Sequence, residues 1–275
     1  MKIKFLIAGC FLVLFSCTKD KEIVPYKLPS FEKTVGTNGT DILVDATVNT
    51  SESVMCVGYT NGVGAGGNDG WLVNVSNTGE ILWQQTFGGS GDDYFNSILK
   101  TADGGFLITG FTQSNSAGAE DVWLLKLSVS GLVEWEKRYG GITTDLGINS
   151  IQLSDGTYIV SASTNSSGAG LLDHWLIKLD AAGTIISSKT FGNNVNQGYA
   201  HIMQKPDGNF FISGGTDKNG NSDFDVIEIN SNLDSLHEYI FGSPDYEEAK
   251  NIVVLPDGNF ILGGHSAGFG NPEHN

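Results

Sequence analysis

Acidic and aromatic residues recur along this sequence at long, nearly regular intervals. Their side chains are the groups of this chain best suited to binding a ligand. They are Asp92, Asp93, Tyr94, Asp145, Tyr199, Asp245, Tyr246 and Glu247. Carboxylates gathered in one place attract cations and basic groups, and aromatic rings provide stacking surfaces for ligands. These residues therefore form a candidate rim for a cation, a sugar or a basic peptide. Each also has a structural interpretation, because Asp caps loop backbone and Tyr fills gaps between packed elements.

Residues with catalytic potential do not recur in the same way. The sequence contains no HExxH, paired CxxC or GxSxG motif, and its five histidines fall at different offsets within the interval: His174, His201, His237, His265 and His274. A catalytic site needs a convergent set of acids, bases or metal ligands. We therefore expect a protein that is not an enzyme.

The elements that must position these residues are revealed by a recurring tripeptide. It stands at Thr34-Val35-Gly36, Thr86-Phe87-Gly88, Arg138-Tyr139-Gly140, Thr190-Phe191-Gly192 and Ile240-Phe241-Gly242, at spacings of 52, 52, 52 and 50 residues. The second interval predicts four strands, at 96–101, 105–110, 121–127 and 132–138, with Asp103-Gly104 as a hairpin turn. The turn dipeptide returns as Asp155-Gly156, Asp207-Gly208 and Asp257-Gly258.

Four antiparallel strands per interval predict an all-β fold, a β-propeller of four-stranded blades with four complete repeats and a partial fifth. A β-sandwich has no reason to repeat at this period, and a β-helix coil is about half as long or less. Each sheet would bury both faces between its neighbours. The predicted core of the second blade comprises Ile98, Phe106, Ile108, Trp123, Leu125 and Trp135.

The connections from strand 2 to strand 3 and from strand 4 to the next blade emerge on the same face of such a fold. They carry the long polar segments 61–69, 88–93, 112–120, 164–173 and 217–222, so this face is the predicted binding surface. His201 takes a first-strand position that Ser97, Ser150 and Asn251 hold in other blades, facing a central channel. A lone His there fits a structural role better than a catalytic one.

Charge excludes one class of partner. The net charge is −16, and removal of residues 1–16, which include Lys2 and Lys4 and no acid, makes it −18. Such an acidic chain is not expected to bind nucleic acid. Asn219 to Asp225 is acidic enough to suggest calcium, but it lacks the Gly at the sixth position and the distant Glu of an EF-hand loop. No cofactor is predicted.

The N-terminus has the order of a processing signal, with basic Lys2 and Lys4 followed by an apolar run from Phe5 to Phe15. Leu14-Phe15-Ser16-Cys17 resembles the lipobox of bacterial lipoproteins, which implies that Cys17 is acylated and anchors the chain to a membrane. An ordinary secretory signal with an incidental Cys is the alternative. We expect residues 1–16 to be a signal peptide, 17–27 a lipidated tether and 28–275 the propeller domain.

The repeats themselves resemble known families. The segments Phe210 to Gly215 and Asn259 to Gly264 are similar to kelch repeats, and Asn77 to Trp83 is similar to the docking motif of PQQ-like propellers. Trp83 to Asp93 with Asp103-Gly104-Gly105 most closely resembles exported bacterial propeller lipoproteins. That resemblance covers nearly the whole mature chain. It implies fold and location rather than an activity.

The fifth repeat is unfinished, because the sequence reaches Asn275 after its second strand. We expect a fragment of a longer chain or an incomplete ring, in which the strand Leu28 to Val35 could complete the last blade. The predicted function is a lipoprotein of the outer membrane or cell surface that serves as a non-catalytic module binding a protein or glycan. The alternative is a propeller enzyme, quinoprotein-like or glycan-acting, with its site at the channel mouth.

Overall fold

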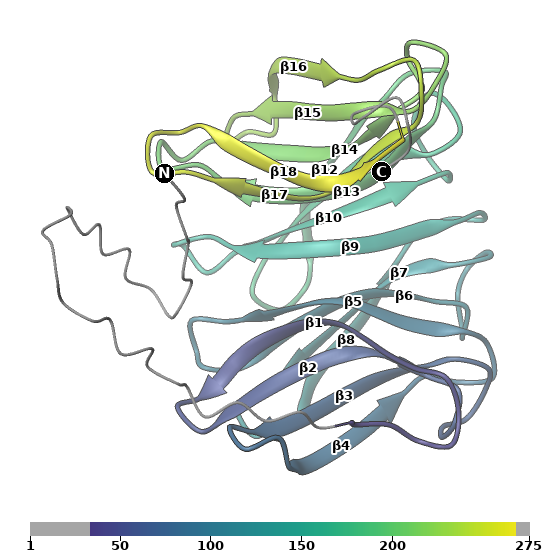
Figure 1. Ribbon diagram of the computed structural model, residues 1–275, viewed down its shortest axis with the longest axis vertical. Coiled ribbons are helices and arrows are strands. Elements are labelled where there is room, and N and C mark those ends of the chain that lie inside the picture. The colour runs from purple at the N-terminus through teal and green to yellow at the C-terminus, as the bar shows by residue number, and fades with distance from the viewer. Residues whose placement is uncertain (1–33, 268–275) are drawn as a thin grey trace, which may run out of the picture. The chain divides into compact units, whose positions relative to one another are not determined.

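The computed structural model describes residues 34–267, which form strands and turns (Figure 1). The signal, the tether and most of the segment Leu28 to Val35 lie outside this range. The strands run β1 Asp41–Thr50, β2 Ser53–Thr60, β3 Asp69–Ser76, β4 Ile81–Phe87, β5 Asp93–Lys100, β6 Phe106–Thr112, β7 Asp121–Leu127, β8 Val133–Tyr139, β9 Asp145–Gln152, β10 Tyr158–Thr164, β11 Asp173–Leu179, β12 Ile185–Phe191, β13 Gln197–Gln204, β14 Phe210–Thr216, β15 Asp223–Ile229, β16 Ser235–Phe241, β17 Glu247–Val254 and β18 Phe260–Ser266. This part of the chain contains no helix that could cross a membrane.

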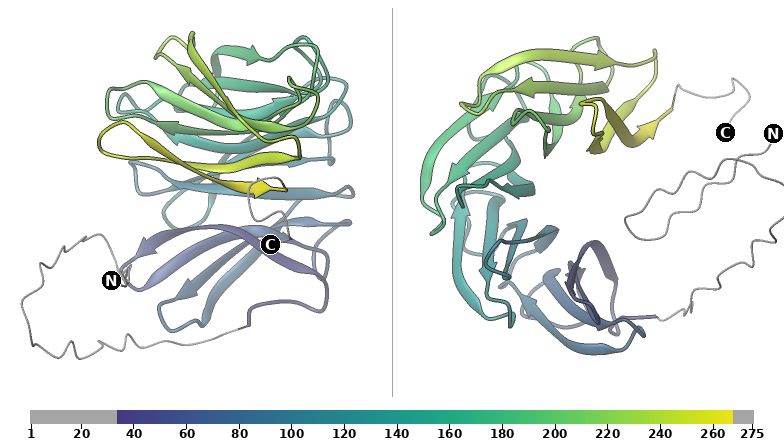
Figure 2. Two further views of the ribbon diagram at one scale, coloured as in Figure 1. Left: turned by 45° about the horizontal axis from the view of Figure 1, so that its top comes forward. Right: turned by 90° about the vertical axis from the view of Figure 1, so that its left-hand side faces the viewer.

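The strands form the predicted repeats. Four sheets have four antiparallel strands each, in the orders β1-β2-β3-β4, β5-β6-β7-β8, β9-β10-β11-β12 and β13-β14-β15-β16, and β17 pairs with β18 in a fifth sheet. The innermost strands of successive sheets contact one another, β1 with β5, β5 with β9, β9 with β13 and β13 with β17. Figure 2 shows these sheets following one another around a common centre. The all-β propeller prediction is confirmed, with the fifth blade represented by two strands.

The recurring Asp-Gly dipeptides lie in the hairpins that join the first and second strands of each blade. Gly104 has a φ of 84°, and its N–H donates to the Thr101 carbonyl oxygen at 2.9 Å. Asp103 Oδ1 accepts from the Gly105 N–H at 2.9 Å. Glycine adopts this left-handed conformation without a steric penalty. The same turn returns at Gly156, Gly208 and Gly258, with φ values of 86°, 91° and 85°.

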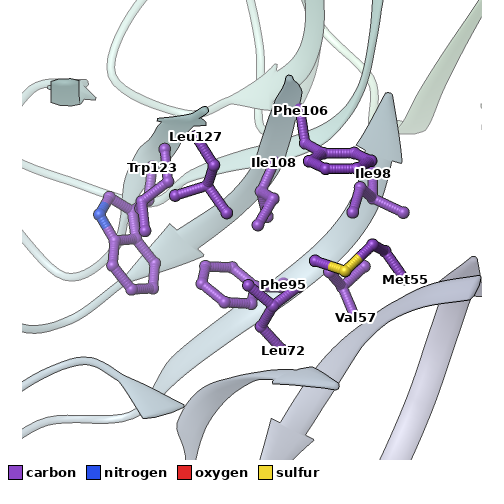
Figure 3. Close-up of a cluster of buried hydrophobic side chains, with 10 residues drawn as sticks. Met55, Val57, Leu72, Phe95, Ile98, Phe106, Ile108, Trp123 and Leu127 are labelled. Atoms are coloured by element: carbon purple, nitrogen blue, oxygen red, sulfur yellow. The ribbon is translucent and has the colours of Figure 1, made fainter. Parts of the chain in front are cut away.

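The core lies between neighbouring blades, as expected from strands that bury both faces. One cluster joins the first two blades, and Figure 3 shows Met55, Val57 and Leu72 of the first facing Phe95, Phe106 and Trp123 of the second. The predicted members Ile98, Ile108 and Leu125 belong to it as well. Trp135 packs at the margin of the next cluster, between the second and third blades. Further clusters join the third blade to the fourth and the fourth to the fifth.

The predicted long-loop face is confirmed by a repeating set of backbone hydrogen bonds. In each case a strand 2–3 loop bonds the neighbouring interblade loop: Asp93 N–H donates to Asn68 O at 2.7 Å, Asp145 N–H to Glu120 O at 2.8 Å, and Gln197 N–H to Leu172 O at 2.6 Å. Both kinds of loop therefore emerge together at one end of the propeller. They lie where the innermost strands begin.

Every innermost strand has a bulge at the same place. The pairing of β1 with β2 shifts between Leu43 and Asp45, and that of β5 with β6 shifts between Phe95 and Ser97. Equivalent shifts occur in β9, β13 and β17. A bulge inserts a residue that has no partner and re-aims the side chains beside it. The repeated bulge turns two residues of each innermost strand toward the centre.

In the second blade this bulge packs against a glycine of the neighbouring strand, whereas the third blade has Ala162 at that position, opposite Gly147. A Cβ at Gly110 of β6 would lie 1.9 Å from the Tyr94 carbonyl oxygen, which belongs to the backbone and cannot move aside. We predict that Gly110→Ala lowers the free energy of unfolding by about 1–3 kcal/mol, the cost of overpacking a close-packed site. Urea denaturation measures the loss. Gly263→Ala is the control, because nothing lies within 4 Å of its Cβ; an equal loss in both variants would contradict the account.

Candidate functional site

A cavity of about 230 Å³ lies where the five innermost strands meet. Each strand contributes two residues from its bulge. Together they are Val44, Asp45, Asn96, Ser97, Ile148, Asn149, Tyr199, His201, Lys250 and Asn251. Most of these side chains are polar. Ligand sites use a small number of placed polar groups to fix the orientation of what binds. This cavity is the candidate functional site.

One residue of each pair occupies a single column of the repeat. The column consists of Asp45, Ser97, Asn149, His201 and Asn251, at spacings of 52, 52, 52 and 50 residues. The sequence alignment placed Ser150 in it, and the structure corrects that assignment by one residue. Ser150 is buried and accepts a hydrogen bond from the Thr109 hydroxyl at 3.1 Å. The repeat spacing of 52 residues from Ser97 leads to Asn149, and Ser150 lies one residue beyond it.

Three polar side chains of the cavity also tie neighbouring strands together. Asp45 Oδ2 accepts from the Ile98 N–H at 2.9 Å. Asn149 joins the third blade to the fourth. Its Oδ1 accepts from the Ile202 N–H at 2.9 Å, and its amide donates to the Ile202 carbonyl oxygen at 3.0 Å. The Asn96 amide donates to the Gly147 carbonyl oxygen at 2.8 Å. The walls of the cavity are thus fixed by the same side chains that line it.

His201 holds the corresponding position in the fourth blade but makes no such tie. Its Nδ1 is buried and has no hydrogen-bond partner among the described residues. Burial lowers the pKa of His201 to about 4, and the nearby charge of Asp45 opposes this shift only in part. The imidazole is therefore neutral at pH 7. A neutral imidazole beside a cavity has the protonation state of a general base.

Ser213 is the residue best placed to orient that imidazole. It lies directly opposite His201 in the β13–β14 register, is fully buried, and its hydroxyl also lacks a partner within residues 34–267. In the third blade the equivalent Ser161 hydroxyl donates to Asn149 Oδ1 at 2.5 Å. A hydrogen bond from His201 Nδ1–H to the Ser213 hydroxyl oxygen would hold the proton on Nδ1 and leave the Nε2 lone pair free to act as a base.

Tyr199 enters the cavity in a strained conformation. Its φ is 45°, within the two-residue irregularity of β13 between Gly198 and His201. For a bulky residue this conformation costs about 1–3 kcal/mol and is most often kept at functional sites. The ring is 45% exposed, and the Lys250 ammonium lies 3.1 Å from its centroid. Lys250 also pairs with Glu248 at 2.6 Å.

The residues of the sequence-predicted rim divide into two groups. Asp93, Asp145 and Glu247 are fully buried at the first position of β5, β9 and β17. Their carboxylates accept hydrogen bonds from the interblade loops, for example from the Gly89 N–H to Asp93 and from the Gly141 N–H to Asp145, both at 2.8 Å. They fit the structural interpretation, because they cap backbone and are shielded from solvent.

The other rim residues lie nearer the surface. Asp92 is half-buried and accepts from the Asn68 backbone at 2.7 Å, and Tyr94 stacks on Phe111 at 4.8 Å. Asp245 and Tyr246 are exposed, and partial burial of its ring, together with the hydrogen bond to Glu248, raises the pKa of Tyr246 to about 12. Of the eight candidates, only Tyr199 lines the cavity. Sequence reasoning missed Asp45, Asn149 and Lys250, although their spacing from Ser97, His201 and Asn251 could have pointed to them.

The segment considered for calcium forms a hydrogen-bonded turn. The amides of Asn219 and Asn221 donate to the Asp223 carboxylate at 2.6 Å and 3.2 Å. These donors occupy the oxygens that a cation would need. Within residues 34–267, no group of three or more His, Cys, Asp or Glu side chains is arranged to hold a metal ion.

Comparisons with known proteins support the fold. Neither family models nor curated sequences match the chain. Among solved structures, puromycin hydrolase aligns with a TM-score of 0.51 at 12% identity, covering 82% of this chain and 36% of the enzyme. A protein of unknown function from Bacteroides caccae aligns with a TM-score of 0.49 at 16% identity, covering 77% of this chain and 65% of that protein. A thermostable family-43 glycoside hydrolase aligns with a TM-score of 0.48 at 10% identity, covering 84% of this chain and 87% of the hydrolase.

Identities this low show the fold alone, and the chain spans only about a third of puromycin hydrolase. The likeness to puromycin hydrolase nevertheless corrects our expectation that the protein is not an enzyme, because hydrolases use this fold. That expectation rested on the lack of a recurring catalytic motif. A site in the centre of a propeller needs no recurrence, since each blade contributes a different residue at the same position.

Proposed function

We propose that this protein is a hydrolase whose site is the central cavity and whose general base is His201. The observation that carries the proposal is a neutral imidazole among polar side chains from all five innermost strands. In this scheme His201 takes a proton from a cavity water as the water attacks the substrate, and the proton then passes to the leaving oxygen. The Lys250 ammonium and the Asn251 amide supply donors for the oxyanion that develops.

The lining favours a substrate rich in hydroxyl groups. Asn96, Asn251 and Ser97 offer both donors and acceptors, and the exposed Tyr199 ring offers a stacking face. The net charge of −16 disfavours a polyanion. A neutral glycan, or a substituent carried by one, meets these conditions.

The bond attacked is inferred from the acids available. Most glycosidases use two carboxylates that flank the glycosidic bond. Among the described residues that line the cavity, Asp45 is the only carboxylate, and it already accepts from the Ile98 and Ala46 N–H groups at 2.9 Å and 2.8 Å. One imidazole base suits hydrolysis of an acyl ester, such as an acetylated sugar, better than cleavage of the chain itself.

Release of acetate tests this proposal. The purified protein is incubated at pH 7 with acetylated oligosaccharides and 4-nitrophenyl acetate, and in parallel with 4-nitrophenyl glycosides. We expect acetate release from the sugar esters and no cleavage of the glycosides. Cleavage of glycosides alone, or turnover of neither class, would reject His201-dependent ester hydrolysis.

We also propose that the chain is exported and held to a membrane through lipid on Cys17, on the outer membrane or cell surface. The support is the order of basic, apolar and small residues before Cys17. Two or more acyl chains give stable anchoring where one does not. Exposure to the outside fits a protein that acts on glycans.

Fatty-acid labelling tests the anchor. We predict that Cys17→Ser abolishes incorporation of labelled palmitate and leaves the precursor unprocessed. Cys10→Ser is the control, since Cys10 lies within the apolar run and would leave with the signal peptide. Labelling that persists in Cys17→Ser would exclude lipidation at this residue.

A further inference from the structure

Two columns of buried polar residues face each other at the junctions between blades. One stands at the first position of each third strand and comprises Asp69, Asp121, Asp173 and Asp223. The other stands at the first position of the following innermost strand and comprises Asp93, Asp145, Gln197 and Glu247. All eight residues are at most 3% exposed. Neither the cavity nor the proposed reaction uses them.

At the first three junctions both members of the pair lie beside the glycine of the recurring tripeptide. A Cβ placed on Gly140 would lie 2.3 Å from Asp121 Oδ1 and 2.7 Å from Asp145 Oδ2. At Gly88 the corresponding distances are 2.6 Å to Asp69 Oδ1 and 2.5 Å to Asp93 Oδ2. At the first two junctions the two carboxylates therefore lie against the same glycine. Buried acids this close do not both ionise at little cost.

The third junction shows how the chain satisfies this geometry without a second acid. Gln197 replaces the inner acid, and its amide orientation follows from its surroundings. With Nε2 facing Asp173, the amide donates to Asp173 Oδ1 at 2.9 Å and to the Val195 carbonyl oxygen at 3.0 Å. The other amide atom then faces the Thr216 hydroxyl at 3.5 Å. A hydrogen therefore lies between the two side chains of this junction.

At the second junction both facing side chains are acids, so neither has an N–H to donate to the other. Asp121 Oδ2 accepts from the Ala117 N–H at 2.7 Å, but Asp121 Oδ1 is buried and has no partner among the described residues. Asp145 Oδ2 is already surrounded by donors, the Gly141 N–H at 2.8 Å and the Ser166 hydroxyl at 2.6 Å. An orphan buried carboxylate oxygen costs free energy unless it carries or receives a hydrogen.

We propose that Asp121 and Asp145 share one proton, which fills the place that the Gln197 amide hydrogen takes at the third junction. The propeller therefore takes up a proton at the seam between its second and third blades. A cation would need free oxygens on both acids, but N–H and O–H donors already occupy Asp145 Oδ2. A proton is therefore the species that fits between the two carboxylates.

The charged groups around the pair support this assignment. Burial raises the pKa of Asp121 above its ordinary value of 3.8; the Ala117 N–H lowers it, Asp145 raises it further, and Arg138 of β8 lowers it. Arg138 is also paired with Glu136 at 2.5 Å. A group whose folded pKa is raised contributes stability that is present at low pH and is lost as the pH rises through that pKa. The stability that this proton contributes should therefore be lost as the pH rises through the raised pKa of Asp121.

Two substitutions separate the shared proton from a simple packing role. Asp121→Asn keeps the shape of the protonated acid and gives a fixed donor, so its melting temperature should fall less than that of the native chain between pH 5 and 9. Gln197→Glu creates a new acid pair with Asp173, so its melting temperature should fall more, by roughly 2–4 °C. Asp245→Asn, on an exposed loop, is the charge control and should follow the native curve.

A second measurement does not depend on melting behaviour. Infrared spectra at pH 7 should show the C=O stretch of a protonated carboxylic acid, and Asp121→Asn should weaken it. The proposal is overturned if the native chain lacks this band or if Asp121→Asn retains the native pH dependence. A melting temperature that rises on addition of Ca²⁺ would also overturn it, because the pair would then hold a cation.

Discussion

Replacing His201 with Asn is expected to lower kcat for ester hydrolysis by about 10²–10⁴-fold, the usual contribution of a positioned general base. Asn keeps a polar side chain in the cavity but cannot take a proton at neutral pH. KM should change little, because the substrate is held mainly by the amide and hydroxyl groups and by the Tyr199 ring. Initial rates with an acetylated oligosaccharide measure both constants.

The matched control is His237→Asn. His237 is exposed on the outermost strand β16 and does not line the cavity, so the same chemical change there should leave kcat unaltered. Equal losses in the two variants would indicate a general effect on the fold. Full activity in His201→Asn would remove this residue from the reaction.

The pKa of about 4 gives the sign of the pH dependence. His201 acts as a base only when it is neutral, so kcat/KM should be flat near neutrality and fall as the pH drops through about 4. Stability follows the same proton. Between the ordinary value of 6.5 and about 4 the unfolded chain binds a proton that the folded chain does not, so stability is lost as the pH falls across this window.

Truncating Trp123 to Ala is expected to lower the free energy of unfolding by about 3–5 kcal/mol, the range for removing a large aromatic residue from a core. Trp123 is 2% exposed, stacks on Phe95 of its own blade at 4.9 Å, and donates its indole N–H to Glu136 at 2.8 Å. It belongs to the cluster between the first two blades (Figure 3). Urea denaturation followed by far-UV circular dichroism measures the loss.

Trp175→Ala is the control for that measurement. Trp175 holds the same position of the third blade but is only partly buried at the margin of its cluster. Folding removes less apolar surface from water at Trp175, so its truncation should lower the free energy of unfolding by less. If Trp123→Ala is no more costly than Trp175→Ala, the cluster between the first two blades does not carry the stability assigned to it.

The fold could be predicted because the same pattern is repeated. The third strand Asp121–Leu127 has the predicted bounds. The first strand of that blade begins at Asp93 rather than at the predicted 96, since the Asp93 N–H bonds the Asn68 carbonyl oxygen and extends the pairing. Such bonds between distant loops are not visible in strand propensity.

The site was harder to predict for two physical reasons. The bulge on each innermost strand decides which residues face the cavity, and strand alternation alone does not show where the bulge lies. Residue type is also ambiguous, because Asp93 and Asp145 cap buried loops while Asp45 lines the cavity. Only the three-dimensional arrangement separates these roles.

The most direct test of the account is a titration of the His201 imidazole by NMR, in the free protein and with an acetylated oligosaccharide. The account predicts a pKa of about 4 in the free protein and a change in the His201 resonances when the sugar is added. An ordinary pKa near 6.5, or resonances that do not respond to the sugar, would contradict a neutral base in the central cavity.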